Sequence, residues 1–166
     1  MSEAIKILCV DDEENVLRSL KILFLDCDYE IITATSGSEG LEILNNTDTV
    51  QIVISDYRMP QMSGVDFLQD VYRNWPDTLR VVLSGFADMS VIMDAINEGH
   101  IYQFIQKPWV DDKLKATISK ALDHYFMQQK MIGTEKELIK KHQEINNPNT
   151  YQEGPLLFFE DGISHD

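Results

Sequence analysis

Thiols, long apolar runs and basic residues are all scarce in this 166-residue chain. Its two cysteines fit neither a disulfide framework nor a metal site, because Cys9 lies inside an apolar run and Cys27 lies between two aspartates. No apolar run approaches the ~20 residues of a membrane span, and the one near the N-terminus is too short for a signal peptide. We therefore expect a protein of the reducing cytoplasm that does not enter a membrane.

Lysine and arginine number only 14 against 28 acidic residues, so the formal net charge is −14. The field of such a chain repels nucleic acid and anionic membranes, and it attracts metal cations or basic partner surfaces. Direct binding to nucleic acid is therefore not expected. With 43% hydrophobic and 25% charged residues, the composition is that of one ordinary globular domain with some chain to spare.

Five short apolar runs rich in β-branched residues are predicted to be strands. They cover residues 5–10, 30–34, 51–55, 80–84 and 102–106. Segments with helical spacing follow each run, so strand and helix alternate five times. Runs such as IVIS and RVVLS are apolar on both faces, which predicts an α/β fold with a doubly wound parallel sheet between two layers of helices.

Capping signals mark the expected helix ends. Ser36 with Glu39 is a capping box, and Asp111 or Asp112 is the expected N-cap of the last helix. Gly99 is expected to end the fourth helix. These signals agree with the alternation of strands and helices.

A long terminal helix is predicted because residues 113–146 contain no proline and only one glycine, Gly133. Its apolar positions fit a helical stripe imperfectly, and they are Ile118, Leu122, Tyr125, Ile132 and Ile139. Two interpretations stay open. The helix can be a solvated extension of the last helix of the fold, or a coiled-coil stalk that dimerises the protein or carries a signal.

Polar side chains stand at the ends of four predicted strands. Asp11 and Asp12 follow the first strand, Asp56 follows the third, Ser84 ends the fourth and Lys107 follows the fifth. Each residue alone has an ordinary explanation as a helix cap, a turn residue or a solvated charge. In a doubly wound sheet, however, ligands bind beyond the carboxyl ends of the strands, so these groups are expected to meet at one edge.

Together these groups form a chemical unit. Three crowded carboxylates repel one another and raise one another's pKa unless a cation neutralises them. Mg²⁺ suits such a site, since it binds carboxylate, carbonyl and water oxygens and keeps positions open for phosphoryl oxygens. Asp56 is then a carboxylate nucleophile for a phosphoryl group, Lys107 balances the charge of that group, and Ser84 offers it a hydroxyl.

Four motifs at these positions resemble the receiver domain of bacterial two-component response regulators, over about residues 5–125: VDDE, SDYRMPQMSG, VVLSG and FIQKPW. The resemblance implies a flavodoxin/CheY-like fold, a five-stranded doubly wound parallel sheet of order 2-1-3-4-5, here with an extended C-terminal helix. It also implies that a histidine kinase or phosphotransfer protein phosphorylates an aspartate, and that the domain then switches conformation to control a downstream output. Such a protein is a switch that can dephosphorylate itself, and not an enzyme that turns over an external substrate.

The resemblance assigns roles to single residues. Asp56 becomes the phosphoacceptor, with Lys107 and Ser84 as its catalytic partners, and Ser84 is also the switch hydroxyl. The Mg²⁺ ligands become Asp11, Asp12, Asp56 and the backbone carbonyl of Arg58. The peptide bond before Pro108 is expected to be cis, which only an X-Pro bond adopts at low cost.

The switch aromatic of the family falls on Phe104, three residues before Lys107. A phenylalanine can turn inward but has no hydroxyl to bond, so a switch here relies on apolar packing. Phe104 can equally be an ordinary core aromatic, and both interpretations stay open.

The resemblance also divides the chain. Residues 1–125 are the expected receiver domain, residues 126–146 a helical extension or linker, and residues 147–166 an acidic tail that can begin a missing or partial output segment. No output-domain signature occurs in the sequence, so the output is expected to be absent or supplied in trans. A homodimer through the C-terminal helix is expected if that helix is a stalk.

Two other functions compete with this interpretation. A Mg²⁺-dependent phosphohydrolase of the haloacid-dehalogenase type also forms an aspartyl phosphate at a strand end. It needs a general acid two residues after the nucleophile, where this chain has Arg58. The other competitor is a phosphorylation-independent, receiver-like scaffold, although every charged member of the set is present here.

Overall fold

The computed structural model describes residues 4–85, 88–98 and 100–146. Its strands are β1 (Ile5–Val10), β2 (Tyr29–Ala34), β3 (Ile52–Asp56), β4 (Leu79–Ser84) and β5 (Gln103–Gln106). They form one five-stranded sheet of order β2-β1-β3-β4-β5, and every neighbouring pair is parallel. The predicted α/β fold, doubly wound sheet and strand order are therefore confirmed.

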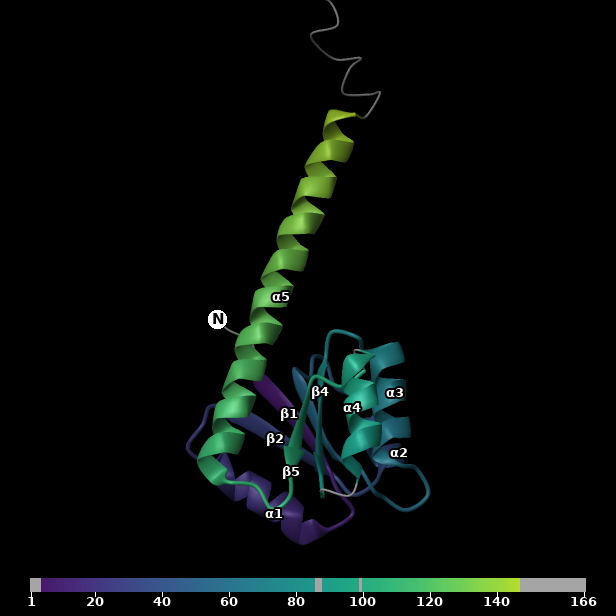
Figure 1. The fold of residues 1–166 in the computed structure, drawn as a ribbon. Coiled ribbons are helices and arrows are strands. Elements are labelled where there is room, and N and C mark those ends of the chain that lie inside the picture. Colours follow the sequence, from purple (N-terminus) through teal and green to yellow (C-terminus); the bar gives the residue numbers. More distant parts are fainter. Residues whose placement is uncertain (1–3, 86–87, 99, 147–166) are drawn as a thin grey trace, which may run out of the picture. The chain divides into compact units, whose positions relative to one another are not determined.

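Five helices connect and cover the strands: α1 (Glu14–Leu23), α2 (Gly37–Asn45), α3 (Gly64–Asn74), α4 (Met89–Asn97) and α5 (Asp111–Ile145). Helix α1 and the first turns of α5 lie over one face of the sheet, whereas α2, α3 and α4 lie over the other (Figure 1). Helices on both faces follow from right-handed crossovers on either side of a parallel sheet. The carboxyl ends of all five strands consequently share one edge.

Alternate residues of each strand enter two hydrophobic cores, one on each face of the sheet. In β1, Ile7 and Cys9 join the core under α1 and α5, and Leu8 and Val10 join the core under α2, α3 and α4. All four side chains are buried. A strand buried on both faces must be apolar throughout, which explains the continuous apolar runs of the sequence.

The helix ends confirm one capping prediction and correct another. Ser36 caps α2 by accepting a hydrogen bond from the Glu39 amide at 3.1 Å. The Glu39 carboxylate accepts a hydrogen bond of 2.6 Å from the Thr35 amide, one residue before the position that a capping box requires. The expected N-cap at Asp111 or Asp112 is wrong, because α5 already begins at Asp111 and both acids lie in its first turn. Carboxylates in a first turn still face the positive end of the helix dipole, so the acidic signal is real although its position was misjudged. Gly99, the expected end of α4, lies outside the described residues.

Helix α5 runs for 35 residues, so the predicted long terminal helix is confirmed. The chain divides into two units, Met1–Tyr125 and Phe126–Asp166. The described part of the second unit exposes several apolar side chains, among them Met131, Leu138 and Ile145. Neither the solvated extension nor the stalk is tested by this observation, and both stay predictions. Within the described part of the chain, no helix is long and apolar enough to span a bilayer.

Candidate active site

Asp56 is the last residue of β3, the central strand of the sheet, so its side chain lies at the shared carboxyl edge. The chain turns tightly behind it. The Gly64 amide donates a hydrogen bond of 2.8 Å to the Tyr57 carbonyl, and a Cβ atom on Gly64 would overlap the Asp56 carbonyl oxygen. Glycine is therefore required where α3 begins, and this contact fixes the backbone beneath the Asp56 carboxylate.

Two more carboxylates follow β1 at the same edge. One ligand atom from each of Asp11, Asp12 and Asp56 lies within 4.8 Å of the others. Asp11 is buried and its Oδ1 accepts a hydrogen bond of 2.8 Å from the Glu13 amide, whereas Asp12 is exposed. The three predicted acids are thus together, and they offer the hard oxygen donors that Mg²⁺ prefers.

Lys107 enters this cluster from the end of β5. Its Nζ donates hydrogen bonds of 2.9 Å to Asp11 Oδ2 and 3.0 Å to Asp56 Oδ1. Its backbone amide donates to the Ser84 carbonyl at 2.8 Å, and the Lys107–Pro108 peptide bond is cis. The structure therefore holds one ammonium against three carboxylates, which leaves the cluster with excess negative charge.

The pKa values of the cluster reflect this imbalance. Burial raises the pKa of Asp56 above its ordinary value; the hydrogen bond from Lys107 opposes this shift, and the charge of Asp11 adds to it. Burial lowers the pKa of Lys107, but its hydrogen bonds to Asp11 and Asp56 outweigh burial and raise it overall. Lys107 therefore stays charged, while ionised Asp56 lacks full compensation by the protein.

Ser84 ends β4, and its hydroxyl is engaged beside the cluster. Ser84 Oγ donates a hydrogen bond of 3.0 Å to Asp88 Oδ2 and has a longer contact of 3.3 Å to the Gly85 carbonyl. Asp88 in turn forms an ion pair with Arg58, and its pKa lies below the ordinary value chiefly because of the hydrogen bond from Arg58. Asp88 was not predicted from the sequence. The only signal for it was an acid four residues after Ser84.

Phe104 is half-buried and packs against the core under α2, α3 and α4, whereas Tyr102 and Ile105 pack against the other core. The position of Phe104 fits both an ordinary core aromatic and a ring that moves. Its predicted role in a switch is therefore untested and stays a prediction.

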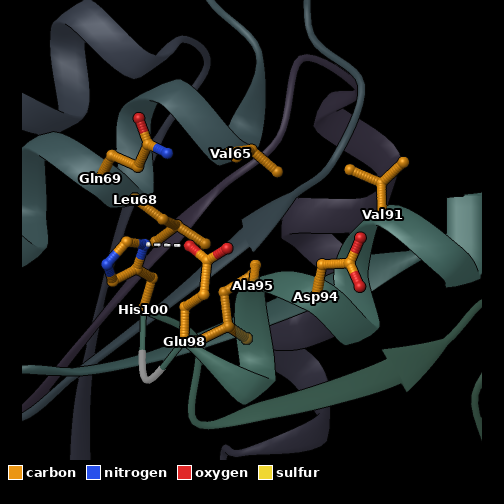
Figure 2. Close-up of a pocket in the computed structure, with 9 residues that line it drawn as sticks. Val65, Leu68, Gln69, Val91, Asp94, Ala95, Glu98 and His100 are labelled. Carbon is orange, nitrogen blue, oxygen red and sulfur yellow. Dashed lines mark ion pairs between the residues drawn. The ribbon is translucent and has the colours of Figure 1, made fainter.

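A hollow lies between α3 and α4 (Figure 2). It is lined in part by Leu68, Val91 and Ala95. Glu98 and His100 also line it, and Glu98 Oε2 lies 3.7 Å from His100 Nδ1. None of the three clustered acids lines this hollow. The candidate chemistry therefore belongs to the sheet edge and not to the hollow.

The family model and the similar known proteins agree on one family. The family model described as "Response regulator receiver domain" matches residues 7–119. The chain is 36% identical over 132 residues to the hydrogenase transcriptional regulatory protein HoxA of Cupriavidus necator, an alignment that covers 80% of this chain but 27% of that protein. The chain thus spans about a quarter of the length of the curated relatives it matches.

Solved structures share the fold as well. A signal receiver domain of an HD domain-containing protein from Pseudomonas fluorescens Pf-5 is 33% identical, with a TM-score of 0.73. An uncharacterised protein from Neptuniibacter caesariensis is 42% identical, also with a TM-score of 0.73. Each alignment covers 78% of this chain and 95% of the other.

Proposed function

Because the chain belongs to the response regulator receiver domain family, in which phosphorylation of an aspartate is the general mechanism, we propose that Asp56 is its phosphoacceptor. One observation carries the proposal. Lys107 Nζ bridges Asp56 and Asp11 at the edge of the sheet, and Asp12 completes a group of three carboxylates there. A receiver is a signalling switch, and its family works with histidine kinases and output domains.

The cluster fits a Mg²⁺ ion, because its donors are carboxylate oxygens and Lys107 leaves part of their charge uncompensated. The residues that would hold the ion are Asp11, Asp12, Asp56 and the backbone carbonyl of Arg58. When bound, Mg²⁺ would neutralise carboxylate charge and stabilise the negative oxygens of an incoming phosphoryl group.

The chain's own residues perform the transfer. A carboxylate oxygen of Asp56 forms a bond to phosphorus while the bond from phosphorus to the kinase histidine nitrogen breaks, and that nitrogen keeps the electron pair. Lys107 is already at the Asp56 carboxylate and balances the charge of the arriving phosphoryl oxygens. The step adds one phosphoryl group to Asp56. We therefore propose a switch that can dephosphorylate itself, and not an enzyme that turns over an external substrate.

Phosphorylation then changes the conformation of the domain, and this change carries the signal to the output. We propose that the Ser84 hydroxyl bonds the phosphoryl group and that Phe104 repacks when Ser84 moves. The switch acts on an output domain or protein. Residues 1–125 form the receiver in this proposal and residues 126–146 a helical extension that can pair with a second copy. Residues 147–166, proposed as the start of an output segment, lie outside the described residues.

Labelling with a small phosphodonor tests the proposal. Incubation of the 166-residue chain with Mg²⁺ and acetyl phosphate should add one phosphoryl group by intact-mass spectrometry. Asp56→Asn should abolish the gain, and a chelator should abolish it in the unmodified chain. Asp70→Asn, which changes an acid on α3 outside the cluster, is the matched control and should label normally.

An Asp56→Asn chain that labels as well as the unmodified chain would refute the assignment, and labelling that persists in chelator would refute the metal site. A chain that takes no phosphoryl group under any condition would instead support the receiver-like scaffold. The phosphohydrolase alternative has no support, because the residue two positions after Asp56 is Arg58 and its guanidinium is paired with Asp88.

A further inference from the structure

Three polar side chains form a connected chain beside Asp56, and the proposed function uses the side chain of only one of them. Ser84 Oγ donates to Asp88 Oδ2 at 3.0 Å. Arg58 donates to Asp88 through Nε, 3.1 Å from each carboxylate oxygen, and through an Nη atom, 2.6 Å from Oδ1. The side chains of Ser84 and Asp88 are buried, whereas the Arg58 side chain is 74% exposed.

Both ends of this chain of contacts lie close to the proposed phosphoacceptor along the backbone or in the sheet. Arg58 follows Asp56 by two residues, and Ser84 ends β4, the strand paired with β3 next to Asp56. Asp88 immediately precedes α4, so it joins these two strand ends to the start of a helix. A change in the Ser84 contact is therefore a change at the junction between the site and α4.

A serine hydroxyl has one hydrogen to donate. While it donates that hydrogen to Asp88, it cannot also donate it fully to a phosphoryl oxygen on Asp56. The acceptor it must leave is an ionised carboxylate in a buried setting, and hydrogen bonds to charged groups are stronger than those to neutral ones. The Ser84–Asp88 contact thus opposes the contact that the switch requires.

From this geometry we propose that Asp88 is a positioning residue that competes with the phosphoryl group for the Ser84 hydroxyl, and that Arg58 weakens the competition. The inference rests on the proposed function of Asp56. Arg58 donates hydrogen bonds to both carboxylate oxygens of Asp88, so this carboxylate keeps hydrogen-bond donors when Ser84 no longer donates to it. Without Arg58, Ser84 would be a larger share of the hydrogen bonding of the buried Asp88 carboxylate, and breaking the Ser84–Asp88 hydrogen bond would cost more free energy.

Asp88 and Arg58 therefore have opposite predicted effects, although they form one ion pair. Loss of Asp88 frees Ser84 and should tighten the binding of a phosphoryl mimic. Loss of Arg58 strengthens the hydrogen bond between Ser84 and Asp88, and it should therefore weaken the binding of the phosphoryl mimic. A general charge effect predicts a different pattern, because it would act equally whether or not Ser84 is present.

The experiment measures binding of beryllofluoride, a phosphoryl mimic, to the full chain with Mg²⁺ by isothermal titration calorimetry. Asp88→Ala should bind about tenfold more tightly than the unmodified chain, which corresponds to about 1.4 kcal/mol. Asp88→Asn keeps a neutral acceptor and should lie between them. Arg58→Met should bind more weakly, and it should have no effect in a chain that already carries Asp88→Ala.

Two controls separate the mechanism from charge. Asp70→Ala breaks an exposed ion pair with Arg73 of 3.1 Å on α3, removes the same charge, and should leave affinity unchanged. Asp88→Ala should have no effect in a Ser84→Ala background. Near-UV circular dichroism checks that each variant is folded, and Asp88→Asn serves if the alanine variant is not.

The outcomes are distinct. If the unmodified chain binds beryllofluoride but Asp88→Ala and Asp88→Asn bind no more tightly, competition by Asp88 is refuted while the proposed function stands. Equal tightening in the Ser84→Ala background would likewise refute it in favour of a charge effect. If the unmodified chain binds no beryllofluoride at all, the proposed function fails and this inference fails with it.

Discussion

Lys107 and Asp11 form a hydrogen bond of 2.9 Å although 96 residues separate them in the sequence. The Asp11 carboxylate is almost wholly buried, and 23% of the Lys107 side chain is exposed. A buried carboxylate that loses its counterion keeps the cost of its lost hydration without a compensating partner. The pair therefore has a structural role as well as a proposed chemical one.

Lys107→Met should lower the free energy of unfolding by about 1–3 kcal/mol in Mg²⁺-free buffer, because it removes the ammonium counterion of both Asp11 and Asp56. Urea unfolding followed by circular dichroism measures the change. Lys115→Met is the matched control, since Lys115 also makes a 2.8 Å ion pair with an aspartate, Asp26, but that carboxylate is 74% exposed. The control should lose no measurable stability. Equal losses in both variants would contradict the structural role of Lys107.

Asp56→Asn should stabilise the chain at neutral pH without Mg²⁺. The pKa of Asp56 is raised in the folded protein, chiefly by burial, so the folded state holds this proton more tightly than the unfolded state does. Its contribution to stability is fully present below the ordinary aspartate pKa of about 3.9 and is lost as pH rises through the raised pKa. At pH 7 the ionised carboxylate therefore destabilises the fold, and asparagine removes that effect.

Thermal unfolding from pH 4 to pH 7.5 checks the sign. The advantage of Asp56→Asn should grow as pH rises through the raised pKa, and an asparagine variant that is less stable at pH 7 would contradict it. Mg²⁺ at about 100 times its Kd should stabilise the unmodified chain by about 2.7 kcal/mol. The variant should gain less, because one proposed ligand is missing.

Much of the fold was predictable because the inner strands β1, β3 and β4 are largely buried on both faces and so appear in the sequence as continuous apolar runs. The meeting of Lys107 with Asp11 and Asp56 was also predictable, since parallel strands place their carboxyl ends at one edge. These predictions needed only the order of the elements and the chemistry of residues at their ends. They did not need the positions of individual helices.

The features that could not be predicted from the sequence depend on where individual helices begin. Asp88 meets Ser84 and Arg58 only because α4 begins where it does, and nothing local in the sequence sets that position. Asp111 was misjudged as a cap because an acid favours both the cap and the first turn of a helix. Sequence therefore predicts which groups share an edge more reliably than which partner each group chooses.

The two cysteines should react at very different rates. Cys9 is fully buried, and burial raises the pKa of its thiol to about 12, with the charge of Asp11 adding to the effect. Cys27 is half-buried, and its pKa is also raised chiefly by burial. The thiolate is the reactive form, so iodoacetamide should modify Cys27 slowly and Cys9 not at all in the native chain.

Intact-mass spectrometry should show one adduct in buffer and two in urea. Cys27→Ser is the control and should show no adduct in buffer and one in urea. Native modification of Cys9 at the rate of Cys27 would contradict the buried position of β1.

Gly64→Ala should be among the more damaging single-methyl changes in the chain. The added Cβ would overlap the Asp56 carbonyl oxygen, and both groups are backbone-bound, so neither can move without shifting β3 or the start of α3. Overpacking of this kind costs about 1–3 kcal/mol, and the upper end is expected here because the obstacle is backbone. Urea unfolding measures the loss, and acetyl phosphate labelling of Asp56 should slow as well.

Gly133→Ala is the matched control for that substitution. Gly133 lies within α5, and a Cβ there would meet nothing within 4 Å. Alanine favours an exposed helix interior over glycine by about 1 kcal/mol, so this variant should increase the helical signal in circular dichroism and label normally. If Gly64→Ala unfolded at the same urea concentration as the unmodified chain, the close approach of α3 to Asp56 would be refuted. If only Gly64→Ala loses stability and phosphoryl labelling, both properties depend on the close approach of the Gly64 backbone to Asp56.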